Sequence, residues 1–366
     1  MFIANIFPMK KKYIKIKKDK AKENQSNAKK FNYGLAILKS ILEFFVELHH
    51  NFRRRTTKNE IIIYYTTERY LILHVPSFFI MSFYLTCKTL LSLNPRKLLN
   101  RLMRLLIPYI GWPFIIFYIN RFLNKKYNKK FPDSYSILKL QLLWGSRYLH
   151  PFWFLWTLII LTIAFSIIIF IFRKHSLFIL QLILILSYVA QYSGFVYNKI
   201  FTKYEEYNRR VFGLFCESVP YAITGFTLGY YKTFDILKKT RIKSLILSMI
   251  IFKVTMDYNI FSYVKSVAFQ GVKLNIQSVC VIFIFSLLPF DKIKNDIVLK
   301  FLTLITKNTA GVYYLHIPIH SYFADYIVDI KRGTFYGSII TYLICYVICF
   351  FGTLIFGKTP IKYLFC

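Results

Sequence analysis

Long runs of apolar residues constrain this chain more than any motif does. The run FWFLWTLIILTIAFSIIIFIF at residues 152–172 carries no charged side chain. A hydrocarbon core about 30 Å thick requires roughly 20 residues of α-helix, and lipid offers no partner for unpaired backbone groups, so such a run predicts a membrane-spanning helix. About ten ranges of this kind are found, at residues 33–52, 71–91, 102–120, 152–172, 177–197, 211–231, 242–263, 274–290, 309–328 and 334–356.

Composition supports the same class of protein. Hydrophobic residues make up 56% of the 366 residues and aromatic residues 19%, which is more than a soluble core could bury. The sequence therefore predicts an all-α, polytopic integral membrane helix bundle with about ten transmembrane helices. No Ser- or Gly-rich linker divides it, so we expect a single transmembrane domain at residues 31–366 after a basic cytosolic tail at residues 1–30.

The cations that give the net charge of +34 are unevenly distributed along the chain. The cations lie between apolar runs and in the amino-terminal tail, where residues 10–30 contain ten lysines. This arrangement favours contact with membrane lipid over binding of nucleic acid, although a biased genome would explain the same abundance of Lys, Ile, Phe, Tyr and Asn. With a cytosolic tail and ten spans, both termini are expected in the cytosol.

Cysteine spacing predicts no metal site. The six cysteines lie in apolar runs or at the end of the chain, and no two of them form a CxxC pair.

Ionisable residues within an apolar run are expensive in lipid, so they are expected to face the protein interior. In residues 33–52, Lys39, Glu43, Glu47 and His50 follow one another along one helical stripe. A glutamate one turn before His50 could orient the imidazole for use as a general base. The spacing is equally compatible with His49 and His50 capping the helix at the membrane interface.

A second cluster of cations runs into the apolar stretch at residues 102–120. Membrane topology alone explains a basic residue such as Lys97 at the mouth of a span. It is less able to explain Arg101 and Arg104, which continue the same helix face toward the membrane interior. Because an arginine fork suits bidentate binding of phosphate, a polyanionic ligand entering from the cytosol is the better interpretation.

His316 lies inside another apolar run, two residues before Pro318. A proline frees backbone groups that a neighbouring side chain must satisfy, so His316 is as readily a packing residue as a catalyst.

The segment at residues 74–113 contains a Pro-x-Phe-Phe-x-x-Ser run followed by Arg-x-x-Arg and a proline, and a Trp-Phe-Leu and a Tyr-x-Leu-His-x-Pro element stand further on. The residues of these motifs are Pro76, Phe78, Phe79, Ser82, Arg101, Arg104, Pro108, Trp153, Phe154, Leu155, Tyr313, Leu315, His316 and Pro318. The pattern resembles that of the acyltransferase-3 family of multi-pass membrane O-acyltransferases. The resemblance covers most of the chain and includes the number of spans.

Three departures from the family pattern accompany this resemblance. Phe83 stands where the family usually has a glycine, so the close helix approach expected there is in question. His150 is separated from Trp153 by two residues, whereas the family histidine directly precedes this element. Two adjacent histidines stand in the first span, of which His50 shares the stripe with the glutamates.

The resemblance implies transfer of an acyl group, usually acetyl, from a cytosolic acyl-CoA donor to a hydroxyl of an extracytoplasmic carbohydrate. His50 or His49 is then the expected catalytic base, with Glu47 orienting it. The donor phosphates are expected at Arg101, Arg104 and Lys97, while Ser82, Trp153 and His316 have substrate or structural roles. The acceptor would be a surface glycan or a lipid-linked glycan, reached from the plasma or inner membrane, and no metal is implied.

The alternative is a transporter or flippase for a lipid-linked glycan. Such a protein would also place charges on span faces and basic residues near an anionic head group. No internal repeat and no pair of interrupted helices is apparent in the sequence, so the enzyme is favoured.

Overall fold

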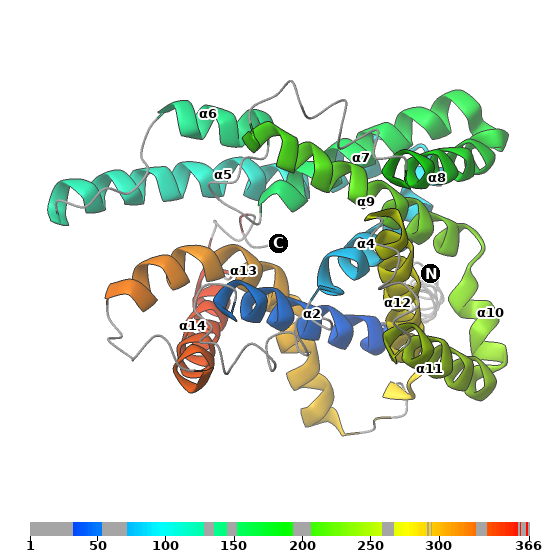
Figure 1. Cartoon of the computed structure of the whole chain (residues 1–366). Helices are drawn as coiled ribbons and strands as arrows, with labels where there is room; N and C mark the ends of the chain where they lie inside the picture. Colours follow the sequence, from blue (N-terminus) through cyan, green and yellow to red (C-terminus); the bar gives the residue numbers. More distant parts are fainter. Residues whose placement is uncertain are drawn as a thin grey trace, which may run out of the picture.

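The computed structural model describes residues 32–52, 72–127, 135–144, 152–192, 206–257, 267–290, 293, 295–326, 335–357, 359 and 364. Within these residues all regular secondary structure is helical, which confirms the all-α prediction (Figure 1). The helices are α2 (Tyr33–Phe52), α4 (His74–Leu91), α5 (Pro95–Tyr127), α6 (Tyr135–Trp144), α7 (Phe152–Phe172), the 3-10 turn η3 (Arg173–His175), α8 (Ser176–Tyr192), α9 (Glu206–Tyr230), α10 (Thr233–Lys239), α11 (Arg241–Asp257), α12 (Val267–Leu287), α13 (Asp296–Tyr326) and α14 (Phe335–Phe356).

Each of the ten apolar ranges overlaps one of these helices. Three stretches of the described residues are both long and apolar enough to cross a membrane, namely Pro95–Phe122, Phe152–Gln191 and Gln270–Leu287. The stretch Leu343–Phe356 of α14 is also apolar. The chain therefore has the helices of a membrane protein, and about ten spans stays a prediction.

The connection between α4 and α5 is short. Only residues 92–94 join the two helices, so the start of α5 lies close to the end of α4. Asn94 caps α5, because its side-chain oxygen accepts a hydrogen bond from the backbone N–H of Lys97 at 3.1 Å. Pro95 occupies the first helical position, where its missing N–H costs nothing. Because of this cap and this proline, α5 begins well before the apolar range at residues 102–120.

The closest helix contact involving α4 is made with α9. A Cβ atom added to Gly225 would overlap the carbonyl oxygen of Ile80, and one added to Gly229 would lie 2.6 Å from Cys87 Cβ. Lipid tails are as apolar as the side chains they meet, so helices in a membrane associate through close packing of this kind. The family glycine that is replaced by Phe83 is therefore not needed for close approach here, since α9 supplies the small residues. Phe83 instead faces α7, with its ring centroid 4.7 Å from that of Phe165.

Short polar contacts fasten the peripheral segments to this core. The hydroxyl of Tyr109 donates to the carbonyl oxygen of Leu142 at 2.9 Å, which holds α6 against α5. Trp112 Nε1 donates to the carbonyl oxygen of Leu364 at 3.0 Å, which holds the end of the chain at the same helix.

On the other side of the molecule α2, α13 and α14 pack together (Figure 1). The hydroxyls of Ser40 and Thr309 share a hydrogen bond of 3.1 Å between α2 and α13.

Candidate active site

Two of the residues singled out from the sequence meet between α4 and α5. Arg101 Nη2 donates a hydrogen bond to Ser82 Oγ at 2.6 Å. The short connection between the two helices brings them together although they are 19 positions apart in the chain. Another nitrogen of the same guanidinium, Arg101 Nε, is buried and has no hydrogen-bond partner among the described residues. Ser82 therefore holds the arginine while one N–H stays available to an acceptor.

The surroundings of Arg101 carry an excess of positive charge. Lys39 of α2 lies within electrostatic range of both Glu43 and Arg101. Arg101 itself also interacts electrostatically with Arg104 and Tyr314. Glu43 is 1% exposed, and it is the only carboxylate that these interactions involve among the described residues. Because charges interact strongly where water is scarce, two or three cations around one carboxylate favour binding of an anion.

Aromatic rings from three helices form one wall beside this cluster. Phe79 of α4 packs against Phe154 of α7 with ring centroids 4.6 Å apart. Phe154 in turn lies 6.1 Å from Tyr313 of α13, and Phe152 stacks on Tyr314 at 6.2 Å. The family motifs on α4, α7 and α13 are therefore in mutual contact, although they are far apart in the sequence.

Trp153 is part of the same wall. It is 7% exposed, and its ring lies 6.2 Å from that of Phe79. Its place indicates a packing role that sets the position of α7 relative to α4.

His316 is fully inside the protein, at 1% exposure. Its Nδ1 lies 2.6 Å from the carbonyl oxygen of Tyr313, and a carbonyl can only accept, so Nδ1 carries the proton. In the neutral ring Nε2 then holds the lone pair. The structure is compatible with both roles considered for His316. Its contact with the backbone of Tyr313 fits a packing residue, and the lone pair on Nε2 fits a catalytic base.

The three cations that are predicted to bind the donor differ in their exposure to solvent. Arg101 is half-buried between helices, whereas Lys97 and Arg104 are exposed. These three residues do lie on one face of α5, as their spacing predicts, but α4 covers only the part of that face that carries Arg101. Arg101 is thus the cation of this group that reaches the interior.

The predicted base and its orienting residue lie on the last turns of α2. Glu47, His49 and His50 belong to this helix, and their side chains lie outside the described part of the structure. The backbone of α2 places them beyond Glu43, along the same helix that carries Lys39.

Sequence reasoning missed Tyr314 as a member of the site. It is buried at 6% exposure, stacks on Phe152 and interacts with Arg101. Its position between Tyr313 and Leu315 of the family motif was the one available signal.

In the part of the chain that the structure describes, no group of three His, Cys, Asp or Glu side chains is placed to hold a metal ion.

The fold and this site define a helical membrane protein with a buried cationic cluster facing a wall of aromatic rings. A family model described as an acyltransferase domain, the acyltransferase-3 family, matches residues 32–358. The match spans nearly the whole chain, so the chain belongs to this family and is an acyltransferase that transfers groups other than aminoacyl groups. Searches of curated proteins and of solved structures gave no match.

Proposed function

We propose that this protein transfers an acetyl or similar acyl group from cytosolic acyl-CoA to a hydroxyl of an extracytoplasmic cell-surface carbohydrate. The observation that carries the proposal is Arg101, which donates a hydrogen bond to Ser82 and whose buried Nε–H has no partner among the described residues, where the nearby charges are mostly positive. A coenzyme A thioester brings phosphates and a carbonyl, and either of these supplies the missing acceptor. Exposed Arg104 and Lys97 would meet the outer, more hydrated part of the same donor.

The acceptor hydroxyl requires a base, and His50 is assigned this role with Glu47 orienting it. A positioned base typically contributes about 10² to 10⁴-fold to the rate of such a transfer. The assignment rests on the Lys39, Glu43, Glu47 and His50 stripe of α2, of which Lys39 interacts electrostatically with Arg101. We further propose that about ten helices span the plasma or inner membrane with both termini in the cytosol.

The proposal is tested by incubating membranes that contain the protein with labelled acetyl-CoA and following label into surface polysaccharide. Arg101→Gln should lower kcat/KM by about 10- to 150-fold, because a hydrogen bond to a charged group contributes about 1.5–3 kcal/mol. Arg121→Gln is the matched control, since it removes an exposed cation of the same helix that contacts Tyr135 and lies outside the cluster. Equal activity of the two variants, or glycan movement without transfer of label, would contradict the proposal.

A further inference from the structure

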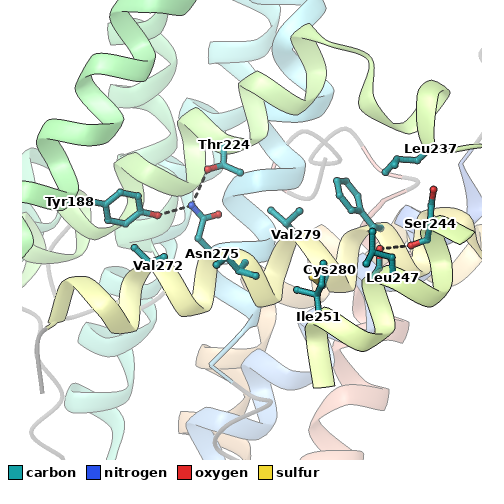
Figure 2. A pocket seen from close by; sticks show the side chains of 13 residues that line it. Tyr188, Thr224, Leu237, Ser244, Leu247, Ile251, Val272, Asn275, Val279 and Cys280 are labelled. Carbon is teal, nitrogen blue, oxygen red and sulfur yellow. Dashed lines mark hydrogen bonds between the residues drawn. The ribbon is translucent and has the colours of Figure 1, made fainter. Parts of the chain in front are cut away.

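A second cavity lies on the α11 side of the molecule, apart from Arg101 and Ser82. It has a volume of about 450 Å³, within the range of small-molecule sites. It extends along α12 from Val272 to Phe283, with α11 as its other long wall (Figure 2). Its lining residues are Tyr188, Thr224, Leu237, Ser244, Leu247, Ser248, Ile251, Val272, Asn275, Ile276, Val279, Cys280 and Phe283. None of these residues belongs to the cationic cluster.

The mouth of the cavity opens onto an apolar surface. Three lining residues are exposed, with Leu247 at 58%, Ile251 at 37% and Ile276 at 36%. They continue into the outer face of α11, where Ile246, Met249, Ile250 and Val254 are all about half exposed between two exposed lysines, Lys243 and Lys253. The sequence predicts a span at residues 242–263, and in such a span lipid hydrocarbon covers an apolar face of this kind, so the cavity would be accessible from the bilayer.

The inner end of the cavity holds an unsatisfied acceptor. Asn275 is 8% exposed, and its Nδ2 donates to the hydroxyls of Tyr188 at 2.7 Å and Thr224 at 2.9 Å (Figure 2). Both amide hydrogens are thus used on the protein, while Asn275 Oδ1 is buried without a hydrogen-bond partner among the described residues. An unpaired buried acceptor costs about 1–3 kcal/mol, so a ligand that donates a hydrogen bond here is favoured.

The charge of the lining decides which donor fits. All 13 described lining residues are uncharged, so an ammonium or a phosphate would be buried without a counter-ion. A hydroxyl donates one hydrogen bond and carries no charge. The lining contains no His, Asp or Glu to act as a base, so the hydroxyl would be bound there and not acylated.

We propose that this cavity binds a neutral membrane lipid alcohol, with its hydrocarbon chain between α11 and α12 and its hydroxyl donating to Asn275 Oδ1. The site is separate from the acyl-transfer site, so it would exist whether or not the donor and acceptor assigned above are correct.

The test uses the purified full-length protein in nanodiscs and a diazirine-bearing analogue of hexadecanol as probe. After irradiation, peptide mass spectrometry should find the label on α11 and α12. Unlabelled hexadecanol should compete about tenfold better than its methyl ether, because the ether cannot donate to Asn275. Label distributed over other helices, or equal competition by alcohol and ether, would overturn the proposal.

Two variants and a matched control sharpen this experiment. Asn275→Leu should abolish the preference for the alcohol over the ether. Ser278→Ala should keep it, because Ser278 is on the same helix, does not line the cavity, and has a buried hydroxyl without a hydrogen-bond partner among the described residues. Ile251→Trp at the exposed mouth should reduce labelling severalfold without touching the polar end, which keeps the proposal testable if Asn275→Leu does not fold. A preference that persists in Asn275→Leu, or labelling unchanged in Ile251→Trp, would refute it.

Discussion

Replacing Ser82 by alanine should release Arg101 without removing its charge. The bond from Arg101 Nη2 to Ser82 Oγ, at 2.6 Å, has a charged donor and is therefore a charge-assisted hydrogen bond. Such bonds contribute about 1.5–3 kcal/mol, and each 1.4 kcal/mol corresponds to a factor of ten. If the whole of this contribution positions the guanidinium for the donor, kcat/KM for acyl-CoA should fall about 10- to 150-fold.

The same helix offers a matched control for this prediction. Ser77 is 0% exposed, and its hydroxyl has no hydrogen-bond partner among the described residues. Ser77→Ala removes an identical group from α4 without breaking a bond, so activity should stay within about twofold of wild type. Ser82→Thr keeps the hydroxyl and should retain most of the activity.

The assay is initial-rate transfer of label from acetyl-CoA in membranes, normalised to the amount of protein inserted. Varying the donor concentration separates KM from kcat, and a misplaced donor-binding arginine should raise KM. The reasoning is wrong if Ser82→Ala and Ser77→Ala behave alike at equal protein levels.

Three further outcomes are expected. Gly225→Ala should lower the thermal unfolding midpoint in detergent, because its Cβ would overlap the Ile80 carbonyl oxygen and overpacking costs about 1–3 kcal/mol; Gly352→Ala, whose Cβ would meet only a flexible Leu side-chain carbon at 3.2 Å, should change it little. His50→Ala should remove labelled product while the protein remains in the membrane, and normal product from that variant would exclude it as the base. Arg104→Ala should raise the KM for acyl-CoA less than Arg101→Gln does, because Arg104 is exposed and charges near water are screened; an equal or larger effect would contradict this ranking.

The helices could be predicted from the sequence, but their ends could not. Apolar runs mark where a helix is buried in lipid, whereas α5 begins at Pro95 and α13 at Asp296, in polar sequence that hydropathy does not score as helix. At α5 the signals were present as the Asn94 cap and Pro95. The short helix α6 lies between the apolar ranges at residues 102–120 and 152–172, where no apolar run marks a helix.

The sequence pointed to Ser82, Arg101 and the aromatic motif residues, which lie near one another in the structure, but it did not indicate how they are arranged, and the catalytic roles stay predictions. Spacing alone placed Lys97, Arg101 and Arg104 on one helix face, and helical geometry does put them there. Which of the three is buried depends on where α4 lies against α5, and that is a property of how the two helices pack. Tyr314 and the aromatic wall depend on the packing of α13 against α7, which no local pattern encodes. The α11–α12 cavity requires several helices at once and had no sequence signal.

The glycine contact between α4 and α9 has a consequence for how the protein is made. Residues 92–205 are synthesised after α4 and before α9, which takes on the order of 10 s at normal translation rates. During that interval the backbone surface of α4 that Gly225 and Gly229 will contact is still uncovered. Both α4 and α5 are made before α9, so Ser82 and Arg101 are both present before the helix that packs on α4. A nascent chain stopped in this window, or one with a bulky residue at Gly225, presents the same uncovered helix face to the machinery that removes unassembled membrane proteins.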